Sequence, residues 1–236
     1  MQIPIIYEDN HIIVVQKPPG IPSQEDETGD ADMLTLIKED IKIRFDKPGN
    51  VYLGLVHRLD RPVGGAMLFA KTSKAASRMS EAVRSRSFDK TYMCVVEGVP
   101  SMLEGDLLHY IVKDTRINQV TVYNKPTTDS KDAKLSYKVL HQANGRSLVA
   151  IKLYTGRSHQ IRAQMAHIGC PLVGDQKYGK VVNKRYSQIA LWSTSITVAH
   201  PTTKELMTFQ SIPQEQQDPW SLFSGQQLTQ AANWFI

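Results

Sequence analysis

Cysteine is scarce in this chain of 236 residues, which contains two, Cys94 and Cys170. They stand far apart, without the paired spacing of zinc ligands, and no H-E-x-x-H motif is present. The sequence therefore contains no pattern typical of a metal site. Isolated cysteines are also typical of proteins whose thiols stay reduced, so we expect a cytoplasmic location.

Long apolar runs and a leader segment are missing as well. No run approaches the roughly 20 apolar residues that a membrane-spanning helix needs, and the N-terminus lacks a basic stretch followed by an apolar one. Hydrophobic residues make up 41% and charged residues 22% of the chain, which is typical of globular proteins. We expect a soluble protein without a membrane partner.

Negative charge is in slight deficit, because 28 lysines and arginines face 23 acidic residues, for a net charge of +5. A modest positive charge suits a polyanionic partner such as nucleic acid. Many basic proteins bind no nucleic acid, however, so the charge alone leaves this question open.

The segment G-L-V-H-R-L-D-R-P-V-G-G at 54–65 places one carboxylate, Asp60, between Arg58 and Arg61. The proline and glycines that follow predict a sharp loop. Neighbouring positive charge favours the ionised carboxylate, and such a group is a plausible nucleophile. Taken alone, an aspartate beside arginines is more often a structural or surface ion pair.

A second polar segment, T-G-R-S-H-Q-I-R-A-Q-M-A-H-I-G, occupies 155–169. Apolar residues recur at helical spacing at Ile161, Met165 and Ile168, and Gly169 followed by Pro171 is a stop signal. The pattern predicts a short helix with an anion-facing first turn. That turn would carry Arg157, Ser158, His159 and Gln160.

In combination these segments resemble the RluA family of pseudouridine synthases. H-R-L-D at 57–60 and T-G-R-S-H-Q-I-R at 155–162 correspond to family motifs, and further matches lie at 7–10, 14–20, 88–92 and 174–179. They follow the family order from Tyr7 to Pro201. The family usually has Thr-Ser-Gly where this chain has Val63-Gly64-Gly65. The first motif begins almost at Met1, so we expect no small N-terminal RNA-binding domain.

The resemblance implies an isomerase that converts specific uridines in structured ribosomal or transfer RNA to pseudouridine. Uracil is detached from ribose and rejoined through carbon 5, without redox chemistry, so no cofactor is expected. Asp60 is implied as the essential catalytic carboxylate, acting either on the nucleoside or as a base on the ribose. Arg162 is expected to pair with Asp60 and keep it ionised. Tyr92 is expected to stack on the uracil and is a candidate to relay the carbon-5 proton.

Bases inside structured RNA are not accessible, so the target uridine must be flipped out. Arg58 is placed to fill the vacated space or to stack against a neighbouring base. Candidate substrate-binding residues besides Arg58 are Arg61, Lys90, Arg157, His159, Gln160 and Leu191. We expect structural roles for His57 and His167. The expected partner is structured RNA rather than DNA, and the oligomeric state stays open.

The main alternative is a catalytically silent relative that binds RNA during folding or assembly. Its support is the Val63-Gly64 departure from the family pattern. The presence of Asp60, Tyr92 and Arg162 favours an active enzyme. A glycosidase-like hydrolase ranks third, because such sites normally use two carboxylates and one is found.

Runs of strands with interspersed helices predict an α+β fold around a mostly antiparallel sheet. The family fold adds a bend, flanking helices and a central cleft. We expect a catalytic domain over 1–212 and a glutamine-rich, apolar extension over 213–236, containing a helix docked onto the domain or onto a second copy. Helices are predicted over 33–44, with Asp32 as N-cap, and over 73–86. Strands are predicted over 11–16, 66–70, 91–97, 106–113, 119–124, 134–140, 148–154, 190–199 and 205–210.

Overall fold

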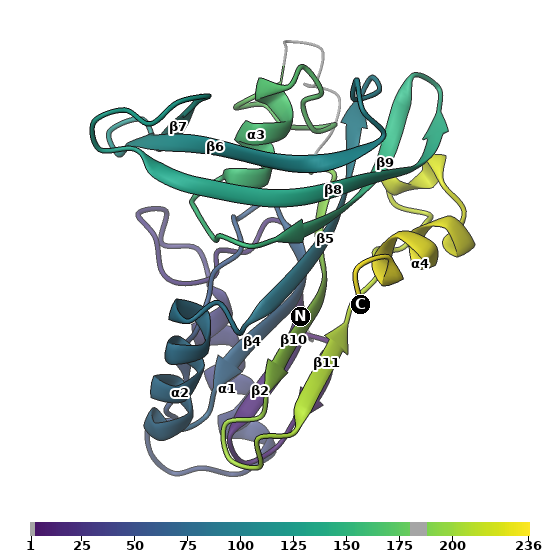
Figure 1. Ribbon diagram of the computed structural model, residues 1–236. Coiled ribbons are helices and arrows are strands. Elements are labelled where there is room, and N and C mark those ends of the chain that lie inside the picture. Colours follow the sequence, from purple (N-terminus) through teal and green to yellow (C-terminus); the bar gives the residue numbers. More distant parts are fainter. Residues whose placement is uncertain (1–2, 180–187) are drawn as a thin grey trace. The chain divides into compact units, whose positions relative to one another are not determined.

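The computed structural model describes residues 3–179 and 188–236 (Figure 1). The chain forms two compact units. Unit 1 comprises Met1–Asp89 and Ser193–Ser211, and unit 2 comprises Lys90–Trp192 and Ile212–Ile236. The last 25 residues contribute to unit 2, while β11 just before them contributes to unit 1.

The sheet of unit 1 is built from antiparallel neighbours. β2 (Ile12–Lys17) pairs with β1 (Ile5–Glu8) and with β4 (Gly64–Ala70), the short β3 (Gly54–Leu55) pairs with β4, and β11 (Leu206–Gln210) pairs with β10 (Leu191–Ala199). All seven residues of β4 are buried, as expected of a continuous apolar run covered on both faces. The core cluster here consists of Ile12, Val14, Ala66, Leu68, Met79, Phe88, Ile196, Val198 and Phe209.

Two helices belong to unit 1. α1 (Met33–Arg44) has the predicted bounds, and the Asp32 side chain accepts hydrogen bonds from the backbone nitrogens of Leu34 and Thr35, as an N-cap does. α2 (Ser73–Arg84) is capped by Thr72. It ends two residues before the predicted boundary because Arg86 has a left-handed φ of 60°.

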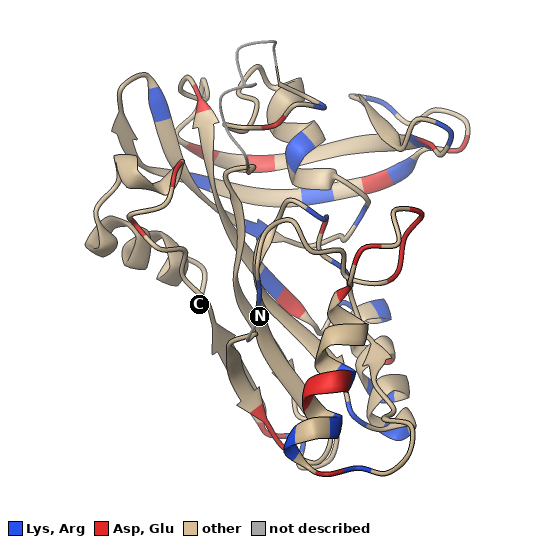
Figure 2. Ribbon diagram, turned by 180° about the vertical axis from the view of Figure 1, so that it is seen from behind, with Lys and Arg blue, Asp and Glu red and all other residues tan. Residues whose placement is uncertain are grey.

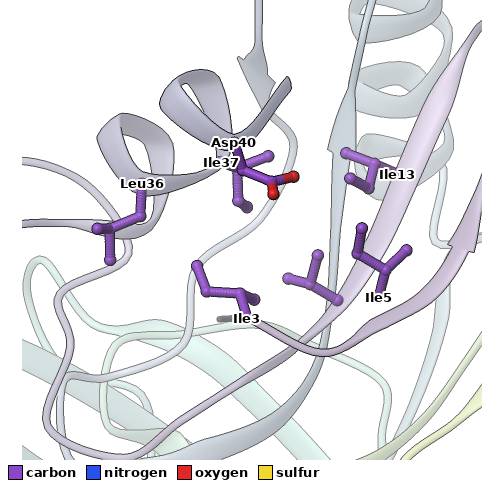
Figure 3. Close-up of a pocket in the computed structure, with 7 residues that line it drawn as sticks. Ile3, Ile5, Ile13, Leu36, Ile37 and Asp40 are labelled. Atoms are coloured by element: carbon purple, nitrogen blue, oxygen red, sulfur yellow. The ribbon is translucent and has the colours of Figure 1, made fainter. Parts of the chain in front are cut away.

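Packing of α1 against β1 and β2 leaves a small cavity of about 40 Å³ (Figure 3). It has room for a few water-sized molecules and is too small for a nucleotide. Its lining is aliphatic apart from Asp40, which excludes it as the RNA site. The lining residues are Ile3, Ile5, Ile13, Val15, Leu36, Ile37 and Asp40.

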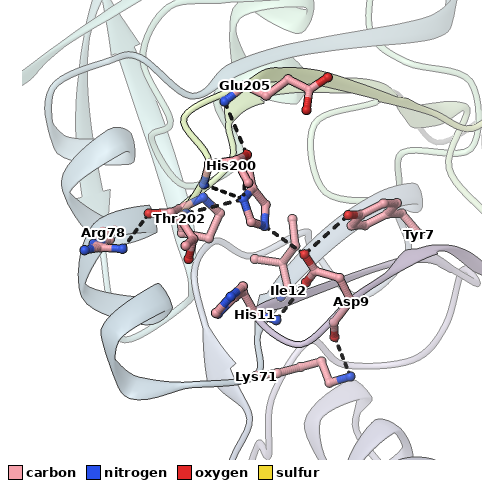
Figure 4. A network of polar contacts seen from close by, with 11 residues as sticks. Tyr7, Asp9, His11, Ile12, Lys71, Arg78, His200, Thr202 and Glu205 are labelled. Atoms are coloured by element: carbon pink, nitrogen blue, oxygen red, sulfur yellow. Dashed lines mark hydrogen bonds and ion pairs between the residues drawn. The ribbon is translucent and has the colours of Figure 1, made fainter.

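A partly buried network joins the β1–β2 turn to the β10–β11 turn (Figure 4). The Asp9 carboxylate accepts from the backbone nitrogens of His11 and Ile12, both at 2.7 Å, and contacts Nε2 of His200 at 2.8 Å. Nδ1 of His200 accepts from the backbone nitrogen of Thr203 at 3.0 Å. The imidazole proton therefore sits on Nε2 and is donated to Asp9, which ties the two ends of the unit 1 sheet together.

The strands of unit 2 pair in antiparallel fashion in the order β5–β9–β8–β6–β7. Its strands are β5 (Asp89–Glu97), β6 (Glu104–Asp114), β7 (Gln119–Tyr123), β8 (Lys131–Ala143) and β9 (Arg146–Leu153). The predicted antiparallel α+β architecture is confirmed. The long β6 and β8 pair over eight residues of register, from Glu104↔Lys138 to Ile111↔Lys131.

Helix α3 (Gln160–His167) and the C-terminal segment complete unit 2. The short 3₁₀ helix Trp220–Leu222 and α4 (Gly225–Asn233) bury Trp220, Phe223 and Leu228 in one cluster with Trp192. The rings of Trp192 and Trp220 meet edge to face, with centroids 6.3 Å apart. No helix in the described ranges is long and apolar enough to cross a membrane.

Candidate active site

The structure divides the predicted site residues between the two units, and each group is described within its own unit. Unit 1 contains Arg58, Asp60 and Arg61. Unit 2 contains Lys90, Tyr92, Arg157, His159, Gln160, Arg162 and Leu191.

Asp60 lies in the loop between β3 and β4, and the loop is fixed from both sides. The backbone nitrogen of Val63 donates to the Asp60 carbonyl at 3.0 Å, which closes a tight turn. The hydroxyl of Ser23 accepts from the Leu59 nitrogen at 3.1 Å and donates to the Leu59 carbonyl at 2.7 Å. Leu59 is buried and Asp60 is half-buried, so the carboxylate sits on a backbone with little freedom.

Lys17, at the end of β2, is fully buried beneath this loop. Its ammonium donates to the carbonyls of Pro18 and Arg61 at 3.1 Å and of Val63 at 2.8 Å. Burial lowers the pKa of Lys17 to about 7, although the negative charge of Asp60 acts in the opposite direction. The sequence motif at 14–20 contained this lysine, but its role depends on contacts 44 and 46 residues away.

Two residues of this segment have a structural explanation, namely Val63, which departs from the family's threonine, and Gly65, which stands where the family also has glycine. Val63 is 2% exposed and belongs to the apolar core. Gly65 has φ of +115°, and a Cβ at this position would lie 2.3 Å from the Ser193 carbonyl oxygen. Only glycine is compatible with that approach.

The two arginines beside Asp60 have different surroundings. Arg58 is exposed. Arg61 donates from Nε to the Gly20 carbonyl at 3.0 Å and from Nη1 to the Thr28 hydroxyl at 3.1 Å, and its Nη2 pairs with Asp30. An acid-rich loop ahead of α1 therefore surrounds Arg61, and Figure 2 shows its concentration of negative charge.

Tyr92 and Lys90 lie two residues apart on β5, so their side chains point to the same face of the sheet. Tyr92 is 6% exposed and pairs in register with Ile151. Lys90 extends over Gly156, with Nζ only 3.2 Å from the position that a Cβ would take there. Leu191, at the start of β10, is 5% exposed.

The predicted helix start at 157 is wrong, because α3 begins at Gln160. His159 has a left-handed φ of 52°, which separates the preceding residues from the helix. The Gln160 side chain stabilises this conformation, since its Oε1 accepts from the Thr155 hydroxyl at 2.8 Å and from the Arg157 nitrogen at 3.0 Å. Arg157 and His159 thus project from a strained loop rather than from a helical turn.

Two of the predicted RNA contacts hold this loop against β8. Arg157 donates from Nε to the Asp132 carbonyl at 2.8 Å and forms an ion pair with the Asp132 carboxylate. Gln160 donates from Nε2 to the Lys134 carbonyl at 3.2 Å. The polar groups of Gln160 are therefore engaged in positioning the segment.

Arg162, on the first turn of α3, forms a buried two-point ion pair with Asp175. Its Nε lies 2.8 Å from Oδ2, and its Nη2 lies 2.9 Å from Oδ1. The Arg162 side chain is 7% exposed and that of Asp175 is 0% exposed. Asp175 and Tyr178 received no role from the sequence, although their motif at 174–179 was noted.

The histidines with expected structural roles make internal contacts. His57 Nε2 accepts from the Leu68 nitrogen at 3.0 Å, and its ring packs against Phe88 at 5.1 Å between centroids. His167 Nε2 lies 2.9 Å from the amide oxygen of Asn124.

Comparison with known proteins finds the same family that the sequence motifs indicated. Residues 11–167 match the family model described as RNA pseudouridylate synthase. Transfer RNA pseudouridine synthase C of Yersinia pestis is 31% identical over 234 residues, covering 92% of this chain and 87% of that protein. Ribosomal large subunit pseudouridine synthase D of Buchnera aphidicola is 28% identical, covering 90% of this chain and 70% of that protein.

The fold is also that of a solved human structure, RNA Pseudouridylate Synthase Domain Containing 1. The TM-score is 0.75 at 24% identity, over 98% of this chain and 94% of the human one. With the family match over residues 11–167, the chain belongs to the RNA pseudouridylate synthase family, whose members are isomerases that act on RNA.

Proposed function

We propose that this protein converts specific uridines in structured RNA to pseudouridine, with Asp60 as the essential catalytic carboxylate. The observation that carries the proposal is the fixed Asp60 loop. Three separate groups hold its backbone, namely the Ser23 hydroxyl, the Lys17 ammonium and the Val63 turn. A half-buried carboxylate on a rigid, basic loop is what a reaction at an anionic nucleotide requires.

Arg162 and Tyr92 are proposed to act in the same reaction. The Arg162 guanidinium is held rigidly and keeps its charge, which suits stabilisation of a negatively charged group. Tyr92 presents an aromatic ring on a buried strand, which suits stacking on a detached uracil. Leu191 is proposed to line the apolar side of the base pocket.

RNA recognition is proposed to use Arg58 and the loop before α3. Arg58 is exposed directly beside Asp60, as a side chain that replaces a flipped base would be. Arg61, Lys90, Arg157, His159 and Gln160 complete the proposed RNA contacts. Ribosomal and transfer RNA are the proposed substrate classes, since relatives are named for each, and the proposed location is the cytoplasm.

The test is release of tritium from carbon 5 of uridine in bulk ribosomal and transfer RNA fractions that lack pseudouridine. We expect release by the native protein and a loss of at least about a thousandfold in Asp60→Ala. Asp114→Asn is the matched control, because Asp114 forms an exposed ion pair with Arg116. Its activity should equal that of the native protein.

Comparison of the two RNA fractions then identifies the substrate class. If native protein and Asp60→Ala bind RNA equally and neither releases tritium, the silent RNA-binding alternative replaces the proposal. Equal release by both would instead show that another group supplies the carboxylate chemistry.

A further inference from the structure

The turn containing Asp175 and Tyr178 contacts two of the proposed site residues at once. Asp175 binds Arg162, and Tyr178 binds both Arg162 and His159. All four residues belong to unit 2. Asp175 and Tyr178 are the supporting residues of this contact.

Asp175 is saturated with donors. Besides the two bonds from Arg162, its Oδ1 accepts from the backbone nitrogens of Lys177 at 2.9 Å and Tyr178 at 3.1 Å. Burial alone would raise the pKa of Asp175, but the bonds and charge of Arg162 together with these backbone donors hold that pKa below its ordinary value. The carboxylate is therefore a fixed negative charge in the interior of unit 2.

The two-point contact determines the plane of the Arg162 guanidinium. A guanidinium is rigid and planar, so fixing Nε and Nη2 also fixes the direction of Nη1. Removing two charges from water costs free energy, so a buried ion pair often stabilises a protein no more than apolar residues in the same place would. Orientation of Arg162 is thus a better explanation of the pair than stability.

Tyr178 serves both neighbours through different atoms. The Arg162 guanidinium carbon lies 5.3 Å from the centre of its ring. Its hydroxyl oxygen accepts from the Val120 nitrogen at 2.9 Å and lies 2.8 Å from Nδ1 of His159. The hydroxyl is therefore hydrogen-bonded to His159 and supports its left-handed backbone.

We propose that Asp175 and Tyr178 are positioning residues for the reaction, with Asp175 orienting Arg162 for the chemical step and Tyr178 orienting His159 for RNA binding. The inference rests on the proposed function of Arg162 and His159. The inference predicts that Asp175 affects the rate constant of the chemical step and that Tyr178 affects RNA binding. A purely structural role would change stability alone.

Single-turnover tritium release distinguishes the role of Asp175 from that of Tyr178. Asp175→Asn should lower the rate constant at saturating RNA by roughly 10- to 100-fold, as loss of an orienting partner does at metal sites, with half-saturation unchanged. Tyr178→Phe should raise the half-saturating RNA concentration by roughly 2- to 10-fold, the value of one hydrogen bond, with little change in rate constant. Asp114→Asn again serves as the matched control.

A second measurement observes Arg162 without activity. The Nε–H resonance of Arg162 in ¹⁵N-labelled protein is identified by its loss in Arg162→Lys. It should shift and exchange faster with water in Asp175→Asn but persist in Tyr178→Phe. If Asp175→Asn does not fold, Asp175→Glu keeps the charge while moving the oxygens, and the same losses are expected.

The outcomes are distinct. The inference would be overturned if the folded Asp175 variant kept both its rate constant and its Arg162 resonance unchanged. It would also be overturned if the Asp175 variant and Tyr178→Phe had the same kinetic effects. A native protein that releases no tritium, combined with a displaced Arg162 resonance in Asp175→Asn, would refute the proposed function and leave the orientation of Arg162 by Asp175 established.

Discussion

The Lys17 ammonium lies 2.8 Å from the carbonyl oxygen of Val63, three residues beyond Asp60. This contact anchors the Asp60 loop to the end of β2. It also places a titratable amine in a fully buried position, with a pKa lowered by burial to about 7.

The lowered pKa of Lys17 predicts a pH dependence of stability. Below pH 7 the amine is protonated in both folded and unfolded chains. Between about 7 and the ordinary value of 10.5, the unfolded chain binds the proton and the folded one does not. The free energy of unfolding should therefore rise with pH, by up to about 1.4 kcal/mol per unit.

Urea unfolding of native protein and Lys17→Met at pH 7 and pH 9 measures this contribution. The difference in unfolding free energy between the two proteins should shift in favour of the native protein at the higher pH. A difference that stays constant would mean that the three carbonyl oxygens and Asp60 keep Lys17 protonated.

Gly65→Ala should destabilise the protein by at least about 3 kcal/mol. The added Cβ would lie 2.3 Å from the Ser193 carbonyl oxygen at a φ of +115°, so the β4 backbone must move. Gly49→Ala is the control, because nothing lies within 4 Å of its Cβ position. Denaturant unfolding compares them, and equal midpoints would contradict the predicted steric conflict.

Asp30→Asn should tighten RNA binding by roughly 2- to 5-fold at low salt, with the difference vanishing at high salt. The change removes one negative charge and the ion pair between Arg61 and Asp30, and leaves the longer contact of Arg61 with Asp26 at 3.8 Å. Glu25→Gln removes a charge from the same loop without touching that pair, so its effect should be smaller. Weaker binding by Asp30→Asn would show that RNA needs Arg61 in its observed position.

Trp220→Ala should cost about 3 to 5 kcal/mol of unfolding free energy, the usual loss for a large buried aromatic. Trp220 is 1% exposed and packs against Trp192. Trp234→Ala is the matched control, since Trp234 is 44% exposed. Similar melting temperatures for both variants would mean that the C-terminal segment adds little to the unit 2 core.

Several features follow from local sequence alone. The bounds of α1 were predictable because Asp32 caps it and apolar residues recur at helical spacing, and both signals act within a few residues. Alternation at 91–97 and the polar or glycine turns after it predicted β5 to β9 with small boundary errors, and ordered motifs predicted the family. Such signals depend on neighbours along the chain, so they survive without knowledge of packing.

Other features depended on contacts between distant segments. Asp175 beside Arg162, and Lys17 beside Val63, are partners that packing brings together, and no local pattern encodes which acid meets which base. The later start of α3 has the same origin, because Gln160 bonds to Thr155 and to the Lys134 carbonyl of β8. The sequence by itself determined the family, most of the helices and strands, and the reactive residue types, since these arise from local preferences and motifs. Tertiary structure alone decided which buried groups hold those residues in place, because burial and hydrogen bonding across the sheet set their partners.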